Sequence, residues 1–275
     1  MTKYKMFKPQ GALSAYVKFF WSLEAELGGN EPFVHRALPD NCMEFIFYIK
    51  GNLSISSSSG PEGKTFTSGI FGQAEKFRLF KTETAFSLFG VYLYPFSSTY
   101  LFNLPADILS NEKIDSKTLL GMDGETLEER IMLAPTTEIR IQLVSNFILQ
   151  RIPALLPHES AFLQHVKSVA DTNSLPSITS FARNCNLSRR QFERRFKQLA
   201  GFSPKHFLNI IRFKKALHEM EQTTESLAQT AINAGYYDQS HFTNEFKRLS
   251  GYTPKEFVLH RDAKTDMRAT RDFKR

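Results

Sequence analysis

Two helix faces in the C-terminal part of the chain carry side chains of the kinds that read DNA bases. The segments Leu187–Phe207 and Tyr237–Phe257 align without a gap at an offset of 50 residues. The identical pairs are Phe192/Phe242, Phe196/Phe246, Lys197/Lys247, Leu199/Leu249, Gly201/Gly251, Pro204/Pro254, Lys205/Lys255 and Phe207/Phe257. In each copy the aromatic and leucine positions recur at i, i+4 and i+7, which is one stripe of a helix. The repeat therefore predicts one amphipathic unit that is used twice.

The positions turned away from the apolar stripe are polar in both copies. In a helix they are Arg190, Glu193, Arg194 and Lys197 in the first copy, and Ser240, Thr243, Asn244 and Lys247 in the second. Arg189 and Gln239, at the helix starts, are also expected to reach a groove. Arginine suits guanine edges, asparagine suits adenine, and serine or threonine suits either. One such face alone is usually an ordinary solvated surface, but two copies in one basic region favour DNA.

Short elements with capping signals are expected to hold each polar face in place. Residues 177–185 predict a short helix with Ile178, Phe181 and Ala182 inward, and Asn186 suits the turn that follows. Ser188 is expected to cap the next helix, and Gly201 to end it. A short helix, a tight turn and a capped second helix form the helix-turn-helix plan.

The second copy repeats this plan, and one long helix joins the two. Residues 226–234 predict its first helix, residues 235–237 its turn, and Asp238 the cap of a helix over 239–250. A helix over 204–221 has a broad apolar arc that can face both units. A rigid connector would fix the spacing of the two polar faces, and successive major-groove sites lie about 34 Å apart. The chain would then carry both half-site readers, and a palindromic site is not required.

The positive charge of the chain lies in the same region. Residues 1–157 hold 15 Lys and Arg against 16 Asp and Glu, whereas residues 158–275 hold 20 against 12. The whole excess of the formal charge of +7 thus belongs to the second part. Such an asymmetry indicates an anionic partner, nucleic acid or anionic lipid, although a charged soluble surface is about equally compatible with charge alone.

These motifs resemble the AraC/XylS family of bacterial transcription regulators. The stretch Ala231–Phe257 is similar to the family's second helix-turn-helix signature, and Arg212 with Ala216 resembles its connector-helix motif. The resemblance covers residues 158–262 and implies a monomeric DNA-binding unit of seven helices with two of them in adjacent major grooves. It carries base-reading roles onto Arg189, Arg190, Glu193, Arg194, Gln239, Ser240, Thr243 and Asn244. The chain departs from the family pattern at Asn186, where glycine is common, and at Asn244, where arginine is frequent.

A second set of polar residues is expected to contact the DNA backbone, which positions a protein without reading sequence. The set comprises Ser188, Lys197, Lys205, Arg212, Lys247 and Lys255. Residues 263–275 form a basic tail with little apolar content, for which an auxiliary DNA contact is conceivable.

The first 155 residues predict a β-rich domain with helices after residue 110. Residues 41–50 alternate strictly, with Met43, Phe45, Phe47 and Ile49 on one face and Glu44, Ile46, Tyr48 and Lys50 on the other. Further strands are expected at 64–67, 76–81 and 84–94, the last one buried on both faces, and residues 54–63 are expected to form an exposed loop. The fold class is therefore α+β, with a small antiparallel barrel or sandwich preceding an all-α domain.

Two helices, expected over 126–134 and 137–150, follow the strands and precede a boundary marked by Pro153 and Pro157. The second has a stripe of Ile139, Leu143, Phe147 and Ile148, which fits packing on its own sheet or, as the alternative, dimerisation. The segments 38–47 and 69–73 resemble the sensor-like domains that precede such DNA-binding units.

Several kinds of site are excluded or disfavoured by composition. Two cysteines, Cys42 and Cys185, exclude a disulfide scaffold, and His35 as the only histidine before residue 158 disfavours a metal centre there. Residues 60–65 lack the first glycine of a phosphate loop. No segment has the length of a membrane span, and the N-terminus lacks the apolar part of a secretory signal. No cofactor is expected.

The sequence predicts a cytoplasmic, sequence-specific DNA-binding transcription regulator that is not an enzyme. Its expected partners are double-stranded DNA, RNA polymerase if it activates, and either a small-molecule effector or a second copy in a homodimer; no membrane is expected. Tyr48, Phe77, Phe86 and Tyr92 either line an effector cavity or form plain core, and core is favoured about three to one. The alternative function is a DNA-tethered repair-type enzyme, for which Cys42 near His35 gives weak support.

Overall fold

The computed structural model describes residues 2–27, 32–57, 60–61, 66–154, 162–164, 166–168, 187–223 and 225–260. The predicted first helix at 177–185, the turn at Asn186, Cys185 and the basic tail at 263–275 lie outside the described residues, as does most of the loop at 60–65. The boundary expected between residues 155 and 158 also falls there.

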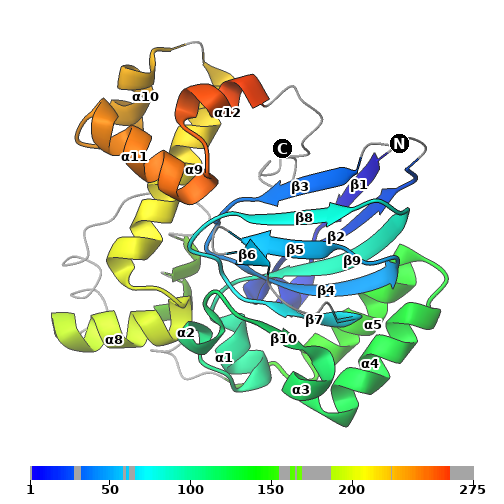
Figure 1. Ribbon diagram of the computed structural model, residues 1–275. Helices are drawn as coiled ribbons and strands as arrows, with labels where there is room; N and C mark the ends of the chain where they lie inside the picture. Colours follow the sequence, from blue (N-terminus) through cyan, green and yellow to red (C-terminus); the bar gives the residue numbers. More distant parts are fainter. Residues whose placement is uncertain are drawn as a thin grey trace.

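The N-terminal part consists of two antiparallel sheets that face each other (Figure 1). The larger sheet has the order β1-β2-β9-β4-β7-β10, and the smaller has the order β3-β8-β5-β6. The strands of the larger sheet are β1 (Thr2–Phe7), β2 (Val17–Ala25), β9 (Phe86–Leu93), β4 (Met43–Lys50), β7 (Ser68–Phe71) and β10 (Lys113–Asp115). The strands of the smaller sheet are β3 (Phe33–Ala37), β8 (Arg78–Thr82), β5 (Ser54–Ser57) and β6 (Gly60–Pro61). This arrangement confirms the predicted antiparallel sandwich, and β9 lies between β2 and β4 as its apolar sequence indicates.

The alternation predicted for β4 places its two faces in two different environments. Met43, Phe45 and Phe47 pack into the core between the larger sheet and the helices. Ile46 and Tyr48 pack into a second core between the two sheets, on the side where Glu44 lines a cavity. The strand β4 therefore separates the core against the helices from the core between the sheets, which contains the cavity.

Helices cover the outer face of the larger sheet. They are α1 (Ser97–Phe102), α2 (Ala106–Leu109), α3 (Ser116–Leu120), α4 (Met122–Leu133) and α5 (Thr137–Leu149), and a 3-10 helix η1 (Gly11–Ala15) precedes β2. Ile131 of α4 and Val144 and Ile148 of α5 are buried in the same core as the side chains on the outer, helix-covered face of the sheet. This packing supports the interpretation of α5 as a helix laid on its own sheet. Ile139, predicted to share that stripe, is 39% exposed because it lies in the first turn of α5.

Two predictions for the strands are wrong in detail. Residues 54–63 were expected to be a loop, but Ser54–Ser57 pair with Lys81–Arg78 and form β5. The signal was hidden because a serine-rich strand pairs through its backbone and contributes few apolar side chains. Of the strand expected at 64–67, residues 66 and 67 are described and are not a strand; β7 begins after them at Ser68, which pairs with Phe47 of β4.

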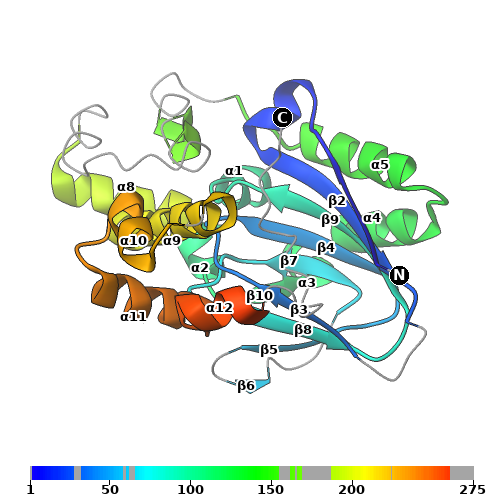
Figure 2. The same cartoon turned by 90° about the horizontal axis from the view of Figure 1, so that it is seen from above.

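The C-terminal part is helical and contains α8 (Arg189–Ala200), α9 (Pro204–Gln222), α10 (Leu227–Ala234), α11 (Gln239–Ser250) and α12 (Pro254–His260). Helix α9 runs from α8 at one end to α10 and α11 at the other, so it joins the two repeats as predicted (Figures 1 and 2). The helix bounds agree with the sequence-based ones to within one residue for α9, α10 and α11.

The two repeats belong to different cores. Phe192, Phe196 and Leu199 of α8 lie in the large core that continues into the N-terminal part, where α8 packs against α2. Phe242, Phe246 and Leu249 of α11 form a separate core with α9 and α10. Leu38 is the buried residue that the N-terminal part contributes to this core of α9, α10 and α11, and Phe77 packs against the same core.

Candidate nucleic-acid interface

Both repeat helices begin with a side-chain cap. Ser188 accepts a hydrogen bond from the Gln191 amide at 3.3 Å, and the Gln191 side chain accepts one from the Ser188 amide at 3.1 Å. In α11, Asp238 accepts a hydrogen bond from the His241 amide at 2.7 Å. Such caps satisfy backbone donors that a helix start would otherwise leave open. Ser188 thus has a structural task in addition to the DNA-backbone contact predicted for it.

The polar face of α8 is open. Arg189, Arg190, Arg194 and Lys197 are exposed, whereas Glu193 is half-buried. Arg189 Nε lies 2.9 Å from Glu193 Oε1. An exposed pair of this spacing contributes only about 0.3–0.5 kcal/mol, so it does not prevent either side chain from turning to another partner.

The polar face of α11 is equally open. Gln239, Ser240, Asn244 and Lys247 are exposed, and Thr243 is half-buried with its hydroxyl donating to the Gln239 carbonyl at 2.8 Å. A hydroxyl that donates within its own helix can still accept a hydrogen bond. The base contacts predicted for α11 would then come from Gln239, Ser240 and Asn244, with Thr243 as an acceptor or an apolar contact.

The residues predicted to contact the DNA backbone differ in accessibility. Lys205, in the first turn of α9, and Lys255, in the first turn of α12, are exposed at equivalent positions of the two repeats. Arg212 is half-buried, with Nη1 3.5 Å from Asn209 Oδ1 and a buried Nε that lacks a hydrogen-bond partner among the described residues. Its geometry favours a role inside the helical unit over a phosphate contact.

Both repeats are also held by the N-terminal part, through the glycines that end their helices. At Gly201, after α8, Ser110 Oγ donates to the glycine carbonyl at 2.9 Å and Gln73 Nε2 donates to the Ala200 carbonyl at 3.0 Å. Asn41 Nδ2 donates to the Phe207 carbonyl at 3.0 Å in the first turns of α9. Side chains of three separate loops thus close on the first repeat.

The equivalent end of the second repeat is held by Arg36 and Phe77. Arg36 Nη1 donates to the Ser250 carbonyl at 2.9 Å, and the Phe77 amide donates to the Leu249 carbonyl at 2.9 Å. The Arg36 guanidinium lies between the rings of Phe77 and Tyr252, at 4.1 and 4.2 Å from their centroids. Sequence reasoning missed these contacts, since they join segments about 200 residues apart that have no common motif.

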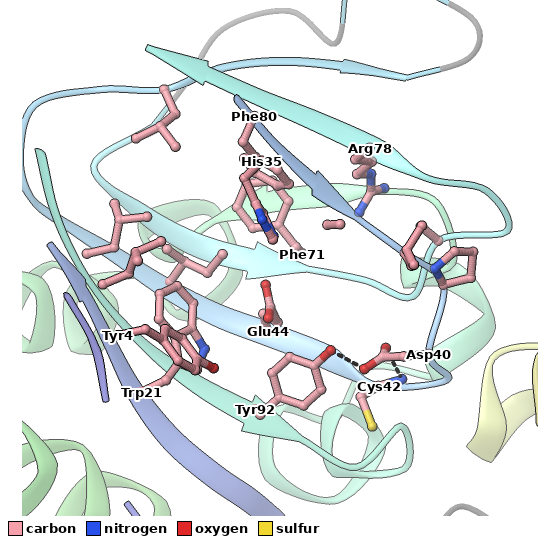
Figure 3. A pocket seen from close by; sticks show the side chains of 18 of the residues that line it. Tyr4, Trp21, His35, Asp40, Cys42, Glu44, Phe71, Arg78, Phe80 and Tyr92 are labelled. Atoms are coloured by element: carbon pink, nitrogen blue, oxygen red, sulfur yellow. Dashed lines mark hydrogen bonds between the residues drawn. The ribbon is translucent and has the colours of Figure 1, made fainter. Parts of the chain in front are cut away.

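A cavity lies beside these loops, between the two sheets (Figure 3). Tyr48 and Tyr92 line it, in agreement with one of the two interpretations of the four aromatic residues. Phe86 is plain core, with its ring tilted by 55° against that of Phe33 at a centroid distance of 4.7 Å, and Phe77 packs against the second repeat. His35 and Cys42 also line the cavity, and Cys42 is buried and not part of a disulfide among the described residues.

Among the described residues, no group of histidine, cysteine, aspartate and glutamate side chains has the arrangement of a metal site. None of the helices in the described part combines the length and the apolar character that crossing a bilayer demands.

Comparisons with known proteins match both parts of the chain separately. A family model described as a helix-turn-helix domain matches residues 181–259, and one described as a domain of unknown function (DUF6597) matches residues 5–115. The HTH-type transcriptional activator RhaS of Escherichia fergusonii is 36% identical over 147 residues, which are 52% of this chain and 50% of that protein. The HTH-type transcriptional regulator MtrA of Neisseria gonorrhoeae is 35% identical over 66 residues, 24% of this chain and 22% of that protein.

The chain spans only about a fifth to a half of the length of these curated relatives. Among solved structures, ToxT from Vibrio cholerae covers 94% of this chain and 98% of its own, with 12% identity and a TM-score of 0.44.

Proposed function

Because the chain belongs to the AraC/XylS family of transcription regulators, we propose that it binds specific DNA sites through both of its helix-turn-helix units. Helices α8 and α11 would enter successive major grooves on one face of the duplex. Arg189, Arg190, Glu193 and Arg194 would read one site element, and Gln239, Ser240, Thr243 and Asn244 the other. The exposed lysines Lys197, Lys205, Lys247 and Lys255 would neutralise phosphates.

One observation carries this proposal. The two helices present exposed polar faces at corresponding positions, and α9 fixes them at its opposite ends (Figure 1). A solvated surface has no need for such a duplication, whereas two readers joined rigidly match two groove sites one helical turn apart. The formal charge of +8 over residues 158–275 (20 basic against 12 acidic residues) supplies the attraction to phosphate.

The N-terminal part would set the activity of the DNA-binding part. It touches the ends of both repeats through Arg36, Asn41, Gln73 and Ser110. A ligand in the adjacent cavity, or a homodimer contact, would act by changing those bonds. Contact with RNA polymerase, if the protein activates, and action in the cytoplasm complete the proposal.

Selection of bound duplexes from a random pool tests the proposal, repeated at two salt concentrations. We expect enrichment of a site with two short elements about one helical turn apart. Binding without enrichment that is lost steeply with salt would mean contact with the backbone only, and would reject the assignment of the two reading faces.

Arg194→Ala should weaken discrimination at one base position of the selected site by about 1–3 kcal/mol. Arg194 is exposed on the open face of α8, so its loss removes a base contact without disturbing packing. The measurement is the affinity for each single-base variant of the site. Arg130→Ala, which removes an exposed charge of α4 in the N-terminal part, is the matched control. Unchanged discrimination in Arg194→Ala would remove this residue from the reading face.

A further inference from the structure

The cavity between the two sheets has walls that are mostly apolar and that include seven aromatic side chains. Its volume, measured as the space open to the centres of water-sized molecules, is about 100 Å³, and it is partly open to solvent. Tyr4 and Trp21 lie on one side with ring centroids 6.3 Å apart, and Phe71 and Phe80 lie on another at 5.9 Å. The Trp21 indole is fixed because it covers Gly90, where an added Cβ would come within 2.2 Å of the ring. Flat rigid walls of this kind suit a flat apolar ligand.

Two carboxyl groups line this cavity, those of Asp40 and Glu44. Glu44 projects from the start of β4 into the space between the rings (Figure 3). Within the described part of the chain, it neither accepts a hydrogen bond nor forms an ion pair. Burial, followed by the nearby Asp40 charge, raises the pKa of Glu44 to about 8, while Arg78 acts in the opposite direction.

The neighbouring charged groups already have partners. Asp40 accepts hydrogen bonds from the Tyr92 hydroxyl and from the Cys42 amide. Arg78 donates to the carbonyl oxygens of Gly72 at 3.1 Å and Asn111 at 2.7 Å, and so holds two loops together. The other ionisable groups that line the cavity are His35, Cys42, Tyr48, Tyr4 and Tyr92. Glu44 is thus the carboxyl group that a ligand can still engage.

A second polar group of the wall lacks a partner. Trp21 is 6% exposed, and its Nε1–H is buried without an acceptor among the described residues. A buried donor that is left open costs free energy, but this one lies against Gly90 and not at the surface of the cavity. The unpaired carboxyl of Glu44 in an apolar cavity is a feature of a ligand site rather than of a packed core.

We infer that this cavity binds an aromatic primary amine, with the ammonium group on Glu44 and the ring among Tyr4, Trp21, Phe71 and Phe80. The ammonium group would be the positively charged partner that an ionised Glu44 lacks, and aromatic faces stabilise cations further. The inference rests on the proposed function in one respect, since the amine would be the effector of that regulator.

Residues that line the cavity, and their neighbours in the chain, also contact the DNA-binding part. Leu38 lines the cavity and packs in the core of the second repeat, while Asp40 lies beside Asn41, which bonds α9. Gly72 lines the cavity beside Gln73, which bonds the end of α8. A ligand on Glu44 would therefore act on the loops that hold both repeats.

Calorimetric titration of the full chain with three matched probes tests this inference. Tyramine carries an amine, tyrosol a neutral hydroxyl and 4-hydroxyphenylacetate a carboxylate on the same phenol. We expect tyramine to bind at least about tenfold more tightly than the other two. Trp21 is the only tryptophan, so its fluorescence should change with the same affinity and place the amine in this cavity.

The Glu44→Gln variant should weaken tyramine binding by about tenfold or more, whereas Glu24→Gln, an exposed carboxyl of β2, should not. Because the amine needs ionised Glu44, its affinity should also rise with pH up to about 8, the pKa of that group, and then level off. Unfolding midpoints of both variants check their folding, and the selectivity among the three probes needs no variant.

Three results would overturn the inference: equal binding of tyrosol, preference for the carboxylate, or no saturable binding of any probe. A chain that enriches a DNA site and binds no amine would reject this inference alone. A chain that binds tyramine and enriches no site would reject the proposed function and keep the amine site.

Discussion

Gly201→Ala is expected to lower the free energy of unfolding by about 3 kcal/mol or more, because the residue lies both in a strained backbone conformation and against the other part of the chain. Its φ is +78°, and a side chain in the left-handed region costs about 1–2 kcal/mol. An added Cβ would meet Gln73 Oε1 at 1.7 Å and Ser110 Oγ at 2.8 Å.

Gln73 has no free space in which to retreat. It is 2% exposed, and its amide group donates to the carbonyl oxygens of Asn41 at 2.9 Å and Ala200 at 3.0 Å. Moving it would leave buried acceptors open, at about 1–3 kcal/mol for each. Denaturant unfolding of the full chain measures the loss.

Gly11→Ala is the matched control for backbone strain. Gly11 also has a positive φ, +56°, but an added Cβ would meet no atom within 4 Å. The difference between the two variants therefore reports the contact between the two parts of the chain. Equal losses in Gly201→Ala and Gly11→Ala would contradict the role given to Gln73 and Ser110.

The N-terminal part contacts the two repeats at equivalent positions. Gly251 lies 50 positions after Gly201 and has a φ of +80°, and its added Cβ would meet Phe77 at 2.4 Å and Arg36 at 2.7 Å. A glycine that ends a helix suits close approach, because it has no side chain to displace. The glycines that end α8 and α11 thus also lie in direct contact with the N-terminal part.

The repeat shows how much of the DNA-binding part is written in local sequence. The stripes of Phe192, Phe196 and Leu199 and of Phe242, Phe246 and Leu249, together with the caps at Ser188 and Asp238, predict α8 and α11 to within a residue. These signals lie within one helix each, and helical periodicity and capping are local properties. The open polar faces follow from the same geometry.

The sandwich was harder to predict because its strands are stabilised by pairing between distant segments. The alternation of β4 predicts a strand, whereas the serine-rich sequence of β5 predicts a loop, because it becomes a strand only beside β8. The cavity is less accessible still, since Trp21, Glu44 and Arg78 come from three strands that only the fold brings together. The one local signal is a glutamate at the start of the otherwise apolar strand β4.

Phe242→Ala is expected to cost about 3–5 kcal/mol, the typical loss for a buried phenylalanine. Phe242 is fully buried between Tyr236, at 5.2 Å, and Phe246, at 5.5 Å. Its core is separate from the two cores of the N-terminal part, to which Leu38 and Phe77 connect it. The damage should therefore remain within the second repeat.

A local loss of this kind has a specific consequence for DNA. Helix α8 packs in the large core with α2, so it should keep its place when α11 does not. Footprinting on the selected site should then show protection of one element and loss of the other. Ile232→Ala, an exposed position of α10 in the same repeat, is the control and should leave both elements protected.

The outcome separates two ways in which the molecule can work. If Phe242→Ala removes protection of a single element, the two repeats fold and read as separate units that the N-terminal part aligns. If protection of both site elements is lost while α8 stays folded, DNA recognition requires both helices at once. A shift in the contacts at either Gly201 or Gly251 would then be enough to abolish DNA binding. The second result would contradict independent reading and would make the contacts of Gly201 and Gly251 the point at which a ligand exerts control.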